Sequence, residues 1–253
     1  MSKLKGQVAL VTGGSRGIGR AISLALAAAG AKVAINYLSR DVEALETAND
    51  VASAGSEALL VSGDLGEEQS LYEVFQKTTD HFGGLDFFIS AAVAPISRGI
   101  LEMTLDDWER TMTVNARAFL LGSQIAVKHM ADRRGRIIAI SSTGTHIVRN
   151  PKYAPLALAK GAVEAAVRFL ATELAPRGIT VNAVAPGPTN TEAFDAMAGR
   201  DPAELRAQLS RLTPMGRLGE PVDAANLVTF LCSEDGGWIT GQLIYSDGGY
   251  SLR

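Results

Sequence analysis

Short runs of apolar and β-branched residues alternate with longer segments of helical periodicity along the whole chain. A strand followed by a helix and a further strand makes a right-handed crossover, and a series of such units builds a parallel sheet with helices on both faces. The alternation therefore predicts a doubly wound parallel α/β sheet. The expected strands are Val8–Val11, Val33–Ile35, Leu59–Val61, Phe87–Ile89, Arg136–Ile140, Thr180–Val184 and Leu243–Tyr245. The expected helices are Gly17–Ala29, Val42–Ala54, Leu71–Phe82, Leu105–Met130, Leu156–Leu174 and Val222–Leu231.

The chain has a length that suits a single α/β domain. Of its 253 residues 47% are hydrophobic, and no internal repeat, low-complexity tract or linker divides it. We therefore expect one domain over residues 1–253. Within it, residues 188–215 contain Gly199, Pro202 and Pro214 around a short amphipathic stretch. This pattern is typical either of a small mobile lid over a ligand or of a packed surface insertion.

Composition and charge exclude several classes of function. The formal net charge is -3, with acids and bases mixed, so no basic stripe is present that would bind nucleic acid. Cys232 is the only cysteine, and His81 and His129 have no metal-ligand spacing with it. The sequence has neither a signal-peptide pattern nor an apolar run long enough to span a membrane. These features predict a soluble cytoplasmic protein without a metal site.

Glycines cluster between the first expected strand and the first expected helix, in the order Thr12-Gly13-Gly14-Ser15-Arg16-Gly17-Ile18-Gly19. Glycine lets the backbone turn tightly and approach a pyrophosphate, whose charge is met by free amides and the positive end of the helix dipole. The spacing departs from the commonest dinucleotide fingerprint, but the strand, turn and helix context is the required one. The predicted cofactor contacts in this turn are Gly13, Ser15, Arg16, Gly17, Ile18 and Gly19.

No carboxylate follows the second expected strand, where a site for NADH usually has one for the ribose 2'-hydroxyl. The residues there are Asn36-Tyr37-Leu38-Ser39-Arg40. Arg16, with Ser39 or Arg40, is suited to hold a 2'-phosphate by charge-assisted hydrogen bonds, which favours NADPH and NADP+ as cofactors. If both arginines were solvated instead, the cofactor specificity would be dual.

Asp64 follows the third expected strand, at the carboxyl edge of the sheet where ligands bind. Its carboxylate is suited either to accept a hydrogen bond from the adenine amine or to cap the next helix. The neighbouring Leu65 is a further expected cofactor contact.

Five motifs besides the glycine turn resemble those of the short-chain dehydrogenase/reductase (SDR) family, over essentially the whole chain. They are Thr113-Val114-Asn115-Ala116, the expected strand that ends in Ser141-Ser142, Lys160, the run from Val181 to Gly187, and Ser246-Asp247-Gly248-Gly249. The resemblance implies a Rossmann fold with strand order 3-2-1-4-5-6-7 and a homotetramer, or a dimer, built through two long central helices. It implies catalytic roles for Asn115, Ser142 and Lys160. The other expected cofactor contacts are Tyr37, Ala91, Lys160, Pro186, Gly187, Thr189 and Thr191.

Two departures from the family pattern are present. The family's Asn-Asn-Ala-Gly after the fourth strand is replaced by the run from Ser90 to Val93. Leu156 stands four residues before Lys160, where the family has the tyrosine that protonates the substrate oxygen. A leucine cannot donate a proton, so the acid must come from elsewhere.

Tyr153 is the candidate for that acid. It lies seven residues before Lys160, which on a helix brings the two within about 20° of the same face. Pro155 fits the first helical position, which puts Tyr153 in the loop just ahead of the helix. The Tyr-x6-Lys spacing resembles that of the enoyl-acyl-carrier-protein reductase III group, in which such a tyrosine is the acid.

Other sources of the proton remain open. Tyr153 is alternatively a surface or core aromatic in a chain that has lost its acid. Water is a further source, since the family resemblance implies that Asn115 binds a water at a local break in its helix, and so is the substrate itself. His146 follows Ser142 in a loop, where a lone histidine usually faces solvent, and we leave it outside the core site.

Apolar residues dominate the segments expected to line the substrate pocket, which favours a hydrophobic or aromatic substrate. The leading hypothesis is an NADPH-dependent reduction of a ketone on a hydrophobic, polyketide-derived small molecule, similar to the tailoring reductases of aromatic polyketide pathways. The expected lining residues are Val93, Ala94, Pro95, Ile96, Ile147, Val148, Phe194 and Met197.

Two alternative functions are compatible with the sequence. Reduction of an enoyl thioester would require an acyl carrier protein as partner. A non-catalytic NADP(H)-binding protein is the other alternative. Candidate docking residues for the carrier protein are Arg98, Arg133, Arg134, Arg149 and Lys152, each of which is alternatively a solvated surface charge.

Overall fold

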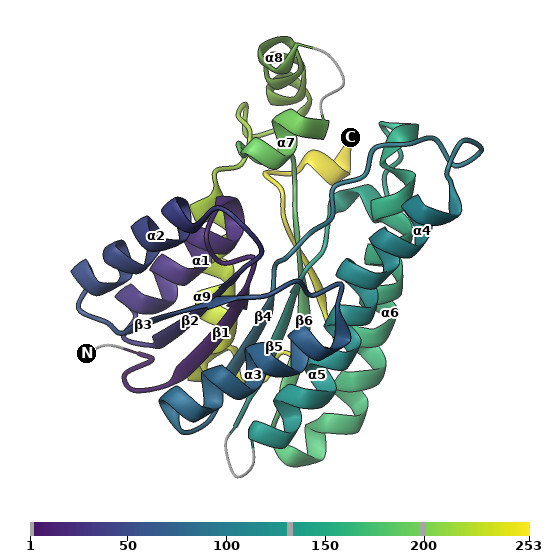
Figure 1. The fold of residues 1–253 in the computed structure, drawn as a ribbon. Coiled ribbons are helices and arrows are strands. Elements are labelled where there is room, and N and C mark those ends of the chain that lie inside the picture. The colour runs from purple at the N-terminus through teal and green to yellow at the C-terminus, as the bar shows by residue number, and fades with distance from the viewer. Residues whose placement is uncertain (1–2, 131–133, 198–200) are drawn as a thin grey trace.

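The computed structural model describes residues 3–130, 134–197 and 201–253, so Arg133 and Gly199 lie outside the described residues. Seven parallel strands form one sheet in the order β3-β2-β1-β4-β5-β6-β7 (Figure 1), which confirms the predicted fold class and strand order. The four central strands are buried along almost their whole length, as the continuous apolar runs predict for a sheet covered on both faces. The strands are β1 (Val8–Thr12), β2 (Lys32–Tyr37), β3 (Ala58–Ser62), β4 (Phe87–Ser90), β5 (Arg136–Ile140), β6 (Thr180–Pro186) and β7 (Leu243–Ser246).

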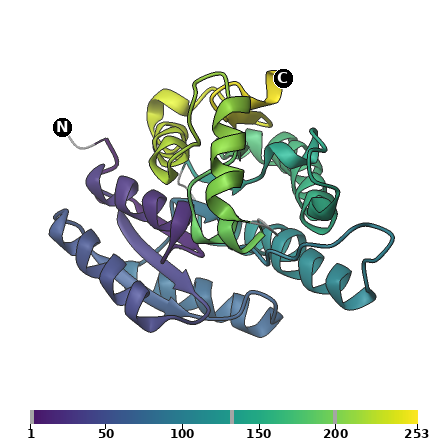
Figure 2. The ribbon, with the colours of Figure 1, turned by 90° about the horizontal axis from the view of Figure 1, so that it is seen from above.

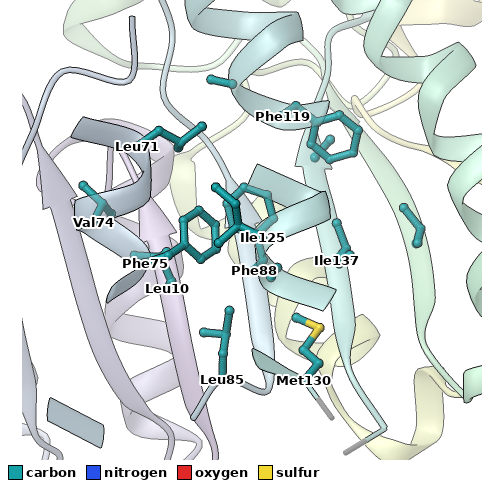
Figure 3. Packing of buried hydrophobic residues seen from close by; sticks show 14 of the residues in the cluster. Leu10, Leu71, Val74, Phe75, Leu85, Phe88, Phe119, Ile125, Met130 and Ile137 are labelled. Atoms are coloured by element: carbon teal, nitrogen blue, oxygen red, sulfur yellow. The ribbon is translucent and has the colours of Figure 1, made fainter. Parts of the chain in front are cut away.

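Helices cover both faces of this sheet (Figure 1). One face packs against α1 (Gly17–Ala28), α2 (Asp41–Ser53) and α9 (Pro221–Cys232). The other packs against α3 (Glu68–Phe82), α5 (Ala118–His129) and α6 (Ala154–Leu174). Figure 3 shows the second of these cores, in which the rings of Phe75 and Phe88 meet edge to face at 5.1 Å between centroids.

The helix expected over Leu105–Met130 consists of three pieces. α4 (Leu105–Thr111) leads into a π-helical turn (Met112–Arg117), which is followed by α5. Thr104 begins α4 with a capping box, in which its hydroxyl accepts from the Asp107 amide and the Asp107 carboxylate accepts from the Thr104 amide. The helix break around Asn115 that the family resemblance implies is therefore present as a π-helical turn, a feature often found at functional sites.

The described parts of residues 188–215, which are 188–197 and 201–215, contain two helices above the carboxyl ends of the strands (Figure 1), and α8 crosses the middle of the molecule when it is seen from above (Figure 2). They are α7 (Glu192–Met197) and α8 (Pro202–Leu212). Asp201 begins α8 by accepting a hydrogen bond from the Ala203 amide, with Pro202 in the first turn. The sequence predicted only one short amphipathic stretch here. Among the described residues, no helix combines the length and the apolar character needed to cross a bilayer.

Candidate functional site

The glycine turn joins β1 to α1 and needs its glycines for close packing. Gly13 and Gly17 have φ values of 62° and 53°, in the region that favours glycine. A Cβ on Gly13 would lie 2.8 Å from the Ala92 Cα, and one on Gly19 would lie 2.1 Å from the Gly13 carbonyl oxygen. Arg16 occupies the N-cap of α1 without a side-chain cap, so the first amides of the helix remain available to an anion. The turn therefore fits a pyrophosphate.

One cavity of about 1230 Å³ extends from this turn to Lys160. It brings together nearly all the residues that the sequence predicted, from the loops that follow the carboxyl ends of the strands, as expected for an open α/β sheet. Asn115 is the exception, since it is buried beneath the cavity and does not line it. The predicted residues that line the cavity are Gly13, Ser15, Arg16, Gly17, Ile18, Gly19, Tyr37, Ser39, Arg40, Asp64, Leu65, Ala91, Ser142, Tyr153, Lys160, Pro186, Gly187, Thr189 and Thr191.

The end of β2 differs from its sequence-based description in one respect. No acid directly follows β2 in the chain, yet Glu192 of α7 reaches this point and its Oε2 accepts from Arg40 Nη1 at 3.0 Å. Arg40 Nη1 also donates to Glu43 Oε1 at 3.1 Å. Burial, together with a hydrogen bond to Asp41, raises the pKa of the Tyr37 phenol beside them. Tertiary structure thus brings a carboxylate of α7 to a point where Asp41 and Glu43 of α2 are already present.

Asp64 does not cap the next helix, because Glu67 is the N-cap of α3. The Asp64 carboxylate accepts a hydrogen bond from the Gly66 amide at 2.7 Å and pairs with Arg110 at 3.7 Å. The capping alternative was therefore wrong. The side chain lines the cavity, where adenine recognition remains its predicted role.

Tyr153 and Ser142 share a hydrogen bond between their side-chain hydroxyls. Tyr153 ends a 3-10 turn (Pro151–Tyr153) and is the N-cap of α6, so it lies ahead of the helix as expected, with the helix beginning one residue before Pro155. Its ring lies against Gly144, where an added Cβ would be 2.5 Å from Tyr153 Cε1. Burial raises the pKa of this phenol, and the hydrogen bond to Ser142 partly offsets the effect.

Leu156 and Lys160 line the same cavity from α6. Leu156 is buried, so an apolar side chain fills the wall at the position where the family has its phenol. Lys160 is also buried, and the loss of hydration lowers its pKa to about 8, while the nearby Glu164 carboxylate acts in the opposite direction. The ammonium form therefore predominates at neutral pH.

Glu164 is a site residue that the sequence reasoning missed. Its Oε1 accepts from Ser141 Oγ at 2.5 Å and from Thr145 Oγ1 at 2.8 Å, and its Oε2 lies 3.0 Å from His146 Nε2. The carboxylate is buried, whereas the His146 ring is half-exposed. A signal was available, because Glu164 follows Lys160 by one helical turn and so shares its buried face.

Asn115 lies in the π-helical turn, where its Nδ2 donates to the Thr111 carbonyl at 3.0 Å. Its Oδ1 is buried and has no hydrogen-bond partner among the described residues. A buried acceptor of this kind is suited to a bound water, as the helix-break prediction requires.

The far end of the cavity is apolar, with one correction to the predicted lining. Val148 is 80% exposed and does not line the cavity, because it lies in the loop between two short 3-10 turns and faces solvent. α8 contributes lining that the sequence did not indicate, namely Leu205, Gln208, Leu209 and Leu212. The predicted residues present are Val93, Ala94, Pro95, Ile96, Ile147, Phe194 and Met197.

Comparison with known proteins places this geometry in a family. A family model described as enoyl-(acyl carrier protein) reductase matches residues 13–251. An oxidoreductase of Methylorubrum extorquens is 40% identical over 98% of this chain and 99% of its own. Versicolorin reductase of Emericella nidulans is 36% identical over 98% of this chain and 96% of its own.

Two solved structures extend the comparison. The reductase LugOII, described as catalysing keto-reduction at C1 during lugdunomycin biosynthesis, is 38% identical with a TM-score of 0.91 and full coverage of both chains. The angucycline C-6 ketoreductase LanV with bound NADP is 37% identical with a TM-score of 0.91, over 100% of this chain and 98% of its own. This chain is therefore an oxidoreductase that belongs to the short-chain dehydrogenase/reductase family.

Proposed function

We propose that this protein is an NADPH-dependent ketoreductase that acts on a hydrophobic, polyketide-derived ketone. The observation that carries the proposal is that Ser142, Tyr153 and Lys160 line one cavity. That cavity also contains the glycine turn and has apolar walls at its other end. Ketoreduction is the activity named for both LugOII and LanV, which supports the reaction type.

We assign the cofactor contacts to the glycine turn and to the loops after β2, β3, β4 and β6. Arg16 and Arg40 converge on the cavity beside Ser39, and two guanidinium groups are suited to a 2'-phosphate. The bound NADP in LanV supports this choice of cofactor. Bound there, NADPH supplies the hydride that reduces the carbonyl carbon.

The residues of this chain provide the proton and the orientation of the ketone. We assign Tyr153 as the acid, because its phenol lines the cavity with Ser142 and Lys160 and can donate its proton to the developing alkoxide. Burial raises the pKa of this phenol and so weakens it as an acid, which the proposed stabilisation of the phenolate by Lys160 offsets. Ser142 holds the substrate oxygen by a hydrogen bond. Lys160 stabilises the phenolate that remains and binds the nicotinamide ribose. Asn115 Oδ1 binds a water that leads protons toward Lys160.

The apolar lining supports a substrate with a large hydrophobic surface. Phe194 and Met197 line the cavity from α7, and Ile147 lines it from the loop after β5. We propose that residues 188–215 form a lid over this ligand, since they lie above the carboxyl ends of the strands (Figure 1). The names of LanV and versicolorin reductase support a polycyclic substrate.

Reduction of an enoyl thioester is the second candidate. The Tyr-x6-Lys spacing and the description of the family model favour it. Two of the carrier-docking candidates already have partners in this structure, since Arg98 pairs with Asp107 at 2.9 Å and Arg149 lies 4.8 Å above the Tyr250 ring. Ketone reduction remains the leading proposal, because ketoreduction is the activity named for both LugOII and LanV.

The test is NADPH oxidation with a polycyclic aromatic ketone and, in parallel, with a crotonyl thioester, with the products identified by NMR. We expect an alcohol from the ketone and no saturation of the thioester. Saturation of the thioester with the ketone untouched would assign the protein to enoyl reduction instead. Heat-inactivated protein is the control for non-enzymatic oxidation.

We also propose that the protein is a cytoplasmic homotetramer or dimer. Large apolar side chains stand exposed on adjacent helices, with Phe169 of α6 78% exposed and Leu120 of α5 41% exposed. Exposed apolar surface of this kind is typical of a protein interface.

A further inference from the structure

Three charged side chains from three separate elements meet at the mouth of the cofactor cavity. Arg16 is the N-cap of α1, Arg40 is the N-cap of α2, and Glu192 is the first residue of α7. Glu192 Oε2 lies 3.0 Å from Arg40 Nη1 and 3.5 Å from Arg16 Nη1. One carboxylate oxygen thus binds both of the guanidinium groups that we assign to the 2'-phosphate.

The position of Arg40 is fixed by an unusual backbone. Its φ is 73°, and among the described residues no other non-glycine residue has a positive φ. A left-handed arginine persists only where the surrounding structure enforces it, and such residues cluster at ligand sites. The side chain is therefore directed by the chain fold toward the cavity that it lines.

Glu192 is also anchored, through the helix that carries it. Arg206 of α8 donates to Asp195 Oδ2 at 2.7 Å and stacks 5.8 Å from the Phe194 ring. These contacts tie α7 to α8. The carboxylate is consequently presented by a pair of connected helices that also line the substrate end of the cavity.

The 2'-phosphate of NADPH and the Glu192 carboxylate require the same donors. Both are anions that bind guanidinium groups by charge-assisted hydrogen bonds, and the phosphate has more charge and more acceptor oxygens. All three side chains are close to half-exposed or more, so water screens the ion pairs and a phosphate can displace the carboxylate at low cost. NADH has a neutral 2'-hydroxyl at this point, which cannot displace Glu192 and can donate to it.

We propose that Glu192 is a specificity-determining residue, a carboxylate of α7 that competes with the cofactor 2'-phosphate for Arg16 and Arg40. NADPH binding releases α7 from both arginines, whereas NADH binding leaves the contacts in place. The inference rests on the proposed use of NADPH by this site. It adds that α7, which lines the substrate end of the cavity, keeps or loses its contacts with Arg16 and Arg40 according to the group on the cofactor's 2'-position.

The experiment compares Glu192→Gln with the unchanged protein in full-length form, by titration with NADPH, NADH, adenosine 2',5'-bisphosphate and 5'-AMP. We expect the dissociation constants of the two 2'-phosphorylated ligands to fall roughly 3-fold to 10-fold, which is the scale of two exposed ion pairs. Those of NADH and 5'-AMP should change less than 2-fold, on the same scale. Equal effects on both classes of ligand, or no effect on either, would overturn the proposal.

Glu43→Gln is the matched control. Glu43 also binds Arg40, at 3.1 Å, but it belongs to α2 and does not contact Arg16 in this structure. We expect the affinity for NADPH to increase less in this variant than in Glu192→Gln. An equal increase would show that the loss of any negative charge beside Arg40 is sufficient, and would overturn the assignment to Glu192 of α7.

Arg16→Ala separates failure of this inference from failure of the proposed function. A selective loss of NADPH binding in Arg16→Ala, with no response in Glu192→Gln, would refute the competition and leave the NADPH site intact. Equal losses of NADPH and NADH binding in Arg16→Ala would refute the proposed 2'-phosphate site itself.

Discussion

At the scale of single residues, the proposed chemistry depends on a phenol that has been displaced by one turn. Tyr153→Phe removes the hydroxyl that shares a hydrogen bond with Ser142 and leaves the ring against Gly144. We expect the rate of ketone reduction to fall by ~100-fold or more, the usual contribution of a positioned acid. Steady-state kinetics with NADPH would measure it. Tyr72→Phe, on the exposed side of α3, is the control.

An unchanged rate in Tyr153→Phe would move the proton source to water or to the substrate. In that case Asn115 becomes the residue to test, because its buried Oδ1 is the acceptor beneath the cavity. If the rate falls in Tyr153→Phe and not in the Tyr72→Phe control, the fall does not come from removing any phenol hydroxyl but from removing this one.

Lys160 sets the expected pH dependence. Its pKa of about 8 means that the ammonium form predominates below that pH and is lost above it. The proposed mechanism uses this positive charge to stabilise the Tyr153 phenolate, so we expect kcat/KM to fall as the pH rises through about 8. Glu164 raises the pKa of Lys160 by its negative charge, and Glu164→Gln should therefore move the fall to lower pH.

A pH profile of kcat/KM for both proteins tests this prediction. Glu173→Gln, at the exposed far end of α6, is the matched control and should keep the original profile. A profile that stays in place in Glu164→Gln would show that the carboxylate acts only through its hydrogen bonds to Ser141 and Thr145.

At the scale of secondary-structure elements, the turn after β5 determines where the Tyr153 ring can lie. Gly144→Ala would bring a Cβ within 2.5 Å of Tyr153 Cε1, so the ring must shift from its position in the cavity. We expect kcat to fall roughly 10-fold or more, since small displacements of reacting groups carry large rate penalties. Kinetic assays at saturating substrate would measure it.

Gly161→Ala is the paired control from α6. A Cβ at Gly161 meets no atom within 4 Å, so the change should leave kcat intact and stabilise the helix by up to about 1 kcal/mol. If both alanine variants retained full activity, the contact between Gly144 and Tyr153 would not fix the position of the acid.

Elements whose apolar residues are buried were predicted accurately from the sequence, whereas elements on the surface were predicted less accurately. β1 and β5 are continuous buried runs, and their predicted bounds agree with the structure within one residue. α7 and α8 have no buried residues, because their apolar side chains line the cavity instead of the core. The leucines of α8 do have helical spacing, which the sequence showed as one short amphipathic stretch, whereas the six residues of α7 are too few to give a periodic signal. The π-helical turn at Asn115 was expected from the family resemblance alone.

The candidate site divides in the same way. Residues carried by local motifs, such as the glycine turn and Lys160, were assigned from sequence and line the cavity. Glu192 was missed because its partner is tertiary, separated from it by 152 residues, whereas Glu164 was missed although its spacing from Lys160 was a local signal. Nothing in the residues around Glu192 indicates that it would meet two arginines.

At the scale of the whole molecule, the outer surface of α4, α5 and α6 is the feature that a single chain does not explain. Trp108 and Leu120 are each 41% exposed, Leu158 is 40% exposed and Phe169 is 78% exposed. Interfaces are enriched in aromatic side chains of this kind. The helices are adjacent (Figure 1), and an association through them would bury these side chains without covering α7 or α8.

We therefore expect Phe169→Asp to dissociate the assembly, because a carboxylate buried at an interface without a partner is strongly unfavourable. Size-exclusion chromatography with light scattering should give the mass of a single chain for this variant and a multiple of it for the unchanged protein. Val42→Asp, which changes an equally apolar position that is 68% exposed on α2, should keep the larger mass. If Phe169→Asp kept it too, the interface would have to lie elsewhere, and the exposed surface of α9 and β7, with Phe230 and Tyr245, would be the next to test.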